Sequence, residues 1–117
     1  MVAKDQFGDE TFVEGMTKKV ESTRGKIKIM NGLYKNKEIL INIPCFTIGR
    51  SSDCALSIHD KKASRIHAQL IESMGKEIIE DMGSSNGTKV NGRTVTKRIL
   101  KDGDIIEIGN TSLQYIK

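Results

Sequence analysis

Three short polar segments combine arginine, hydroxyl, amide and glycine residues, and none of them contains a carboxylate. They are Gly49-Arg50-Ser51-Ser52, Ser64-Arg65-Ile66-His67 and Gly83-Ser84-Ser85-Asn86-Gly87-Thr88. This set suits a tetrahedral dianion, because arginine supplies charge-assisted hydrogen bonds and neutral donors satisfy the remaining oxygens. Glycine-rich turns also point backbone N–H groups at an anion. The alternative is that Ser, Asn and Gly only build turns, and the residue types alone leave both interpretations open.

The elements that must position these segments are short β-strands. Ile27 and Ile29 alternate with lysines, and a similar period-two pattern recurs along the chain. Asn-Gly and Asp-Gly pairs, which are strong hairpin signals, separate several of the runs. The predicted strands are 26–29, 38–43, 46–49, 55–58, 67–73, 77–81, 88–90, 93–95, 104–109 and 112–116. About ten short strands without a helix predict an all-β sandwich or barrel whose loops carry the function.

Four blocks of this pattern, in their order and spacing, resemble the signature of the forkhead-associated (FHA) domain. They are Gly49-Arg50, Ser64-Arg65-Ile66-His67, Ser85-Asn86-Gly87-Thr88 and Asn91-Gly92, and the resemblance runs from about Lys26 to Lys117. It implies an FHA-type β-sandwich of about ten to eleven strands with ligand loops at one end. It also implies a phosphothreonine-dependent binding module that acts as an adaptor or regulatory switch in Ser/Thr kinase signalling.

The resemblance further implies roles for individual residues. Arg50 matches the arginine that pairs with the phosphate, and Ser64 matches the serine that hydrogen-bonds a phosphate oxygen. Arg65 occupies the next, more variable phosphate-contacting position. Ser85 matches a position close to the phosphothreonine, and Asn86 matches the asparagine that bonds the peptide backbone.

Other positions of the signature are implied to shape the loops or to set specificity. Lys62 falls where the family contacts the third residue after the phosphothreonine, and His67 resembles the histidine that braces the loops from inside. The positions expected to be structural are Gly49, His67, Gly87, Asn91 and Gly92.

The charge distribution divides the chain. It has 117 residues with 19 basic and 15 acidic side chains, which gives a net charge of +4. Residues 1–24 carry four bases and five acids and show no strand or helix periodicity. We therefore expect a flexible N-terminal tail at 1–24 and one FHA domain at 25–117.

Thr11 makes the tail a candidate ligand. It lies in the acidic run Asp9–Glu14, and its third following residue, Glu14, is opposite in charge to Lys62. Small bacterial single-FHA regulatory proteins have a similar layout, with a phosphorylatable threonine ahead of the domain. One hypothesis is that phosphorylated Thr11 is captured by the domain itself, and the alternative is a merely solvated terminus.

The remaining function classes find little support. Gly83–Gly87 fits the G-x-S-x-G pattern, but no helix can start after it and both histidines precede Ser85, so we expect no enzyme. The two cysteines and two histidines lack zinc-site spacing, so no metal or cofactor is expected, and Cys45 and Cys54 are expected to be buried strand residues.

Nucleic acid is the rival partner because the body is basic, yet tryptophan is absent and the other aromatic residues are not interleaved with bases. Lys97, Arg98 and Lys101 are interpreted as a solvated rim. The chain has no membrane segment and its start has no secretory apolar region, so a cytoplasmic location is expected. The expected partners are a phosphothreonine-containing protein or peptide and an upstream Ser/Thr protein kinase.

Overall fold

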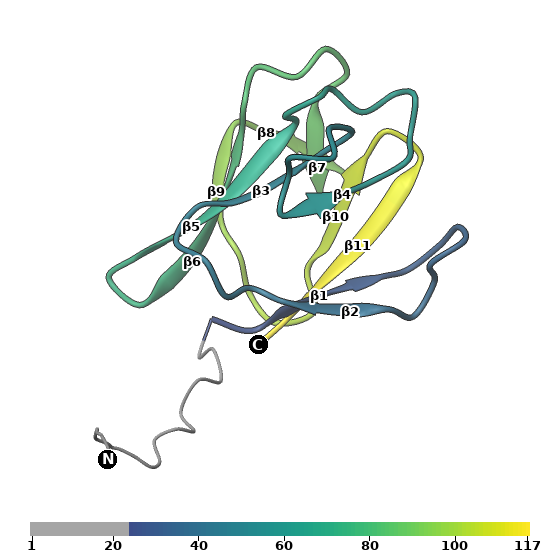
Figure 1. Cartoon of the computed structure of the whole chain (residues 1–117). Helices are drawn as coiled ribbons and strands as arrows, with labels where there is room; N and C mark the ends of the chain where they lie inside the picture. Colours follow the sequence, from purple (N-terminus) through teal and green to yellow (C-terminus); the bar gives the residue numbers. More distant parts are fainter. Residues whose placement is uncertain (1–23) are drawn as a thin grey trace, which may run out of the picture.

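The computed structural model describes residues 24–117, which form eleven strands and no helix (Figure 1). The strands are β1 (Lys26–Ile29), β2 (Glu38–Leu40), β3 (Phe46–Gly49), β4 (Leu56–Ser57), β5 (Ala68–Ser73), β6 (Lys76–Asp81), β7 (Thr88–Val90), β8 (Arg93–Val95), β9 (Lys97–Ile99), β10 (Ile105–Ile108) and β11 (Thr111–Ile116). One sheet has the order β2-β1-β11-β10-β7-β8, and the other has the order β4-β3-β5-β6-β9. The predicted all-β sandwich is confirmed.

The core lies between the two sheets and is built from the inward-facing residues of alternating strands. In β1 the burial pattern alternates, with Ile27 and Ile29 buried and the two lysines partly exposed. β6 and β10 alternate in the same way, and Ile79 and Ile106 are fully buried. β-branched side chains fit this pleated, half-buried setting, so the period-two signal in the sequence corresponds to the face that each residue occupies.

The connections β3–β4, β4–β5 and β6–β7 gather at one end of the sandwich, near the top of Figure 1, and the C-terminus lies at the bottom. Antiparallel pairing fixes this arrangement, because β5 begins at Ala68, which is paired with Ile48 near the end of β3 and with Asp81 at the end of β6. The three polar segments of the sequence therefore emerge side by side.

Two strand predictions need correction. β2 ends at Leu40 rather than at 43, because Leu40 is paired with Lys26, the first residue of β1, and Ile43 is exposed. The sequence pattern does not predict β9, and it indicates only a solvated rim at Lys97 and Arg98. They belong to a short edge strand paired with β6, where charged residues face solvent and protect the open edge.

Arg24, which the sequence assigned to the tail, is packed into the folded body. Its Nε and Nη2 donate to the Glu77 carboxylate at 3.0 and 2.9 Å, and Nη2 also donates to the Leu70 carbonyl at 3.2 Å. The Tyr115 hydroxyl donates to the Arg24 carbonyl at 2.6 Å. Burial, with a smaller contribution from the nearby Glu77, raises the pKa of Tyr115 to about 12. The folded body therefore begins no later than Arg24.

The prediction for the cysteines was half wrong. Cys54 is buried, but Cys45 is exposed, and neither lies in a strand. Thr11 and the rest of the predicted tail up to residue 23 lie outside the described residues. Among residues 24–117 no helix of membrane-spanning length and hydropathy is found.

Candidate functional site

Arg50 directly follows β3 and is oriented by the next loop. Its backbone N–H donates to the Ser64 carbonyl at 3.0 Å, and its side-chain Nε donates to the Ala63 carbonyl at 3.0 Å. Because Nε is held by Ala63, the two terminal amino groups of the guanidinium remain for a ligand. Arg50 lines a hollow of about 280 Å³, here called the loop hollow. Its lining residues are Arg50, Lys61, Lys62, Ala63, Ser64, Arg65, Ser85 and Asn86.

Ser64 joins the β4–β5 loop to the β6–β7 loop. Its Oγ accepts a hydrogen bond from the backbone N–H of Ser85 at 3.0 Å. A hydroxyl that accepts in this way keeps its own proton for donation. Ser64 can therefore donate to an anion in the loop hollow while it fixes the position of Ser85.

Asn86 is held by the opposite loop. Its Nδ2 donates to the Lys62 carbonyl at 2.8 Å. The carboxamide is planar, so this bond directs Oδ1 away from Lys62 and leaves it to accept from a peptide N–H. The same bond fixes the backbone from which the Lys62 side chain extends.

His67 braces the two loops from beneath. The ring is fully buried, and Nδ1 accepts from the Ser64 N–H at 3.0 Å. Nε2 lies 2.8 Å from the Gly87 carbonyl. Since Nδ1 is the acceptor, the proton sits on Nε2 and is donated to Gly87. One side chain thus sets the spacing between the backbones that carry Ser64 and Ser85.

Asp81, which sequence reasoning missed, organises the β6–β7 loop. Its carboxylate accepts from the Ser84 N–H at 3.0 Å, the Ser84 hydroxyl at 2.6 Å and the Thr88 hydroxyl at 2.7 Å. Burial opposes ionisation, but the hydrogen bonds from Ser84 and Thr88 outweigh it and hold the pKa of Asp81 below its usual range. The local pattern Asp81-Met82-Gly83-Ser84 is typical of a side chain that caps its own turn and would have revealed this residue.

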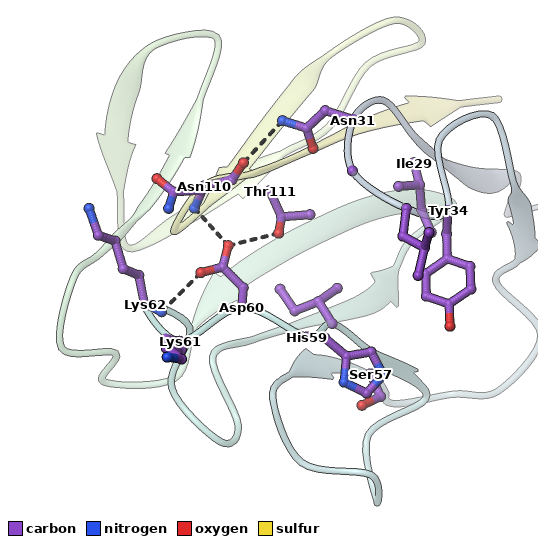
Figure 2. Close-up of a pocket in the computed structure, with 13 residues that line it drawn as sticks. Ile29, Asn31, Tyr34, Ser57, His59, Asp60, Lys61, Lys62, Asn110 and Thr111 are labelled. Atoms are coloured by element: carbon purple, nitrogen blue, oxygen red, sulfur yellow. Dashed lines mark hydrogen bonds between the residues drawn. The ribbon is translucent and has the colours of Figure 1, made fainter.

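Asp60 is a second missed residue, and it fixes the β4–β5 loop. Oδ1 accepts from the Lys62 N–H at 2.9 Å, and Oδ2 accepts from the Asn110 N–H at 2.7 Å and the Thr111 hydroxyl at 2.8 Å (Figure 2). Burial alone would raise the pKa of Asp60. The three hydrogen bonds and the Lys62 charge lower it by more, so the pKa lies below its usual range. The sequence does not reveal how Asp60 holds the β10–β11 turn, because Asn110 and Thr111 are far away in the sequence.

The glycines of the signature have steric roles. A Cβ on Gly49 would overlap the Arg65 carbonyl, so the backbones of the two arginine-bearing segments touch only because residue 49 has no side chain. Asn91 and Gly92 both have positive φ, at 52° and 84°, and form the two-residue turn between β7 and β8. Gly87 also has a positive φ, at 84°, in the β6–β7 loop.

The structure therefore brings the predicted ligand residues Arg50, Lys62, Ser64, Arg65, Ser85 and Asn86 to one hollow. Within residues 24–117 no carboxylate lines it or forms an ion pair with either arginine. Fixed hydroxyl and amide groups beside two guanidinium groups without a carboxylate partner in this part of the chain are chemically able to bind a multiply charged oxyanion. Among the described residues no cluster of metal-ligating side chains is found.

The model of the FHA domain family matches residues 46–109, more than half of the chain. The chain belongs to the FHA domain family. Solved FHA domains share its fold. A structure described in connection with phosphothreonine-dependent FHA domain interactions aligns with a TM-score of 0.73 and 25% identity, over 79% of this chain and 94% of that one. The FhaA FHA domain, solved in complex with the intracellular domain of Rv3910, aligns with a TM-score of 0.71 and 26% identity, over 77% and 97%.

Several relatives of this FHA domain are bacterial regulators. The oxoglutarate dehydrogenase inhibitor of Corynebacterium diphtheriae is 30% identical over 80% of this chain and 65% of its own length. The glycogen accumulation regulator GarA of Mycolicibacterium smegmatis is 29% identical over 93% and 68%. An ABC transporter ATP-binding/permease protein of Mycobacterium tuberculosis is 44% identical over 58% of this chain but only 8% of its own length. This chain therefore spans less than two thirds of the length of the ABC transporter protein and of the oxoglutarate dehydrogenase inhibitor.

Proposed function

We propose that this FHA domain binds a phosphothreonine residue of a protein or peptide in the loop hollow. Arg50 pairs with the phosphate, the Ser64 hydroxyl donates to a phosphate oxygen, and Arg65 adds a second positive charge. The observation that supports this most is the orientation of Arg50, whose Nε is held by the Ala63 carbonyl and whose terminal groups lack a carboxylate partner in the described part of the chain.

The residues around the phosphate position fit an extended peptide. Ser85 lies next to Ser64 through the bond between its N–H and the Ser64 hydroxyl. Asn86, with Nδ2 bound to the Lys62 carbonyl, presents Oδ1 to the peptide backbone, and the exposed Lys62 side chain contacts the third residue after the phosphothreonine. An unphosphorylated threonine would leave the two arginines without a counter-charge, so it is expected to bind poorly.

We further propose that the protein works as an adaptor or switch downstream of a Ser/Thr protein kinase in the cytoplasm, without catalysis and without a cofactor. This proposal is supported by the relatives, which are named as an inhibitor of oxoglutarate dehydrogenase and a regulator of glycogen accumulation. Phosphorylation of Thr11 would then create a ligand on the same chain. Tethering raises the local concentration of such a ligand to about the millimolar range, so weak binding suffices to occupy the site.

Substitution of Arg50 tests the assignment of the site. Arg50→Ala removes the charge partner of the phosphate, which costs about 2–5 kcal/mol, or roughly 30-fold to several thousand-fold in affinity for a phosphothreonine peptide. Arg93→Ala is the matched control, because Arg93 is exposed at the start of β8 and removes the same charge. Fluorescence anisotropy measures both affinities. Equal effects of the two variants would assign binding to overall charge and favour the nucleic-acid alternative.

A further inference from the structure

An apolar groove lies beside the loop hollow and is not used by the phosphate site. It has a volume of about 580 Å³. Ile29 and Ile58, which are buried, form its floor, and Leu33 and Tyr34 of the β1–β2 connection form one wall, with exposed fractions of 91% and 50%. Asn110 and Thr111 contribute to the opposite wall (Figure 2).

The groove is continuous with the loop hollow and is preformed. Lys61 and Lys62 line both. The Asn31 side chain ties the β1–β2 connection to the β10–β11 turn, since Nδ2 donates to the Asn110 carbonyl at 3.0 Å and Oδ1 accepts from the Ser112 N–H at 3.1 Å. Asp60 holds the Lys62 backbone to the same turn. A chain that leaves the phosphate position past Lys62 therefore enters the groove directly.

The charges around the groove favour an acidic occupant. His59, Lys61 and Lys62 stand on its rim, and Lys37 lies over the Tyr34 ring with Nζ 5.8 Å from the ring centroid. The carboxylate that lines the groove, Asp60, accepts three hydrogen bonds through its two oxygens. A segment that combines apolar side chains with a carboxylate complements this surface.

The residues that follow Thr11, Phe12-Val13-Glu14-Gly15-Met16, supply three apolar side chains and one carboxylate. In an extended chain alternate residues share a face, so Glu14 and Met16 lie on one face and Val13 and Gly15 on the other. If Glu14 meets Lys62, Met16 projects two residues further along the same side. That position is the apolar part of the groove.

The length of the chain ahead of Arg24 also fits. The groove lies at the Ile29 end of β1, and Arg24 lies just before the other end, five residues away, or about 16 Å of extended chain. Met16 and Arg24 are separated by eight residues, which span up to about 26 Å. The segment between them is long enough to run back along β1 to the groove.

We propose that this groove binds the segment 12–16 of the same chain, with Met16 against Leu33 and Tyr34 and Glu14 at Lys62, when phosphorylated Thr11 occupies the loop hollow. This inference rests on the proposed function. The groove adds contacts that a short phosphothreonine peptide does not make, so the attached tail competes better than its phosphate alone would allow.

The experiment uses the full 117-residue chain with and without phosphate on Thr11. The probe is a fluorescent phosphothreonine peptide that ends three residues after the phosphothreonine and therefore does not reach the groove. We expect phosphorylation of Thr11 to weaken probe binding, and Leu33→Glu or Met16→Asp to restore it by about tenfold in the phosphorylated chain. Leu33 is exposed, so its substitution leaves the fold intact.

Matched controls separate the groove from general effects. Met74→Glu changes an equally exposed apolar residue, 97% exposed, in the β5–β6 turn, and Val13→Asp changes the opposite face of the segment. Neither is expected to restore probe binding. In the phosphorylated chain, nuclear Overhauser contacts between the Met16 methyl group and the Leu33 methyl groups provide a direct readout.

The outcomes separate this inference from the proposed function. Failure of the unphosphorylated chain to bind the probe contradicts the proposed function and the inference with it. If the probe binds but phosphorylated Thr11 does not compete, or competes equally in the Leu33→Glu and Met16→Asp variants, the inference alone is overturned. Competition that grows with protein concentration assigns the groove to the tail of a second copy and overturns the intramolecular form proposed here.

Discussion

Replacement of His67 by phenylalanine is expected to loosen the phosphate site and the fold together. The ring links the Ser64 N–H to the Gly87 carbonyl, at 3.0 and 2.8 Å. His67→Phe keeps the buried volume but leaves both groups without this partner, and each unsatisfied buried group costs about 1–3 kcal/mol. Both bonds are part-buried, so we expect the lower half of the combined range, a loss of about 2–4 kcal/mol of unfolding free energy.

The variant should also bind more weakly, because the ligand must then order loops that His67 orders in the native protein. If half of the lost free energy must be supplied by binding, the dissociation constant for a phosphothreonine peptide rises about tenfold. Urea denaturation measures the stability and calorimetry measures the affinity. His59→Phe is the control, since His59 is exposed, and it should leave both unchanged. A His67→Phe protein with native stability and native affinity would refute the bracing role.

Three further predictions concern the scaffold. Arg24→Met leaves Glu77 as an unpaired buried charge and should cost about 3–5 kcal/mol in urea denaturation, while the double variant with Glu77→Met should recover most of this loss. The lowered pKa values of Asp60 and Asp81 mean that their stabilisation is complete above a pH of about 4 and falls as pH drops through those values, so unfolding free energy measured from neutral to acid pH should decline, and less steeply in Asp60→Asn. Gly92→Ala, at a φ of 84° in the β7–β8 turn, should lose about 1–2 kcal/mol in thermal unfolding without changing phosphopeptide affinity.

The sequence predicts the sandwich well because the core-facing residues of each strand recur at every second position. Ile27 and Ile29 are buried on one face of β1 for this reason. β9 escaped prediction because an edge strand has few apolar contacts, and Lys97 and Arg98 carry no alternation to detect. The predicted end of β2 is wrong because Ile41 is buried although it lies outside a strand. A buried residue that continues the alternating pattern therefore extends the predicted strand too far.

The proposed ligand residues could be named from the sequence because their order and spacing resemble the FHA signature, whereas their residue types alone left simple turn formation open. The supporting residues were harder to find. Asp81 acts on neighbours within seven positions and left a local signal, whereas Asp60 acts on Asn110 and Thr111, which only the fold brings near it. Arg24 was missed for a similar reason, since its partner Glu77 lies in the other half of the chain.

The central claim, that this FHA domain recognises phosphothreonine through the loop hollow, is tested most directly by a peptide library in which every phosphothreonine peptide has an unphosphorylated twin. The account predicts measurable binding to a subset of the phosphorylated members, at least about 30-fold weaker binding to each twin, and loss of the difference in Arg50→Ala. Equal affinity for both members of a pair in the native protein would contradict it.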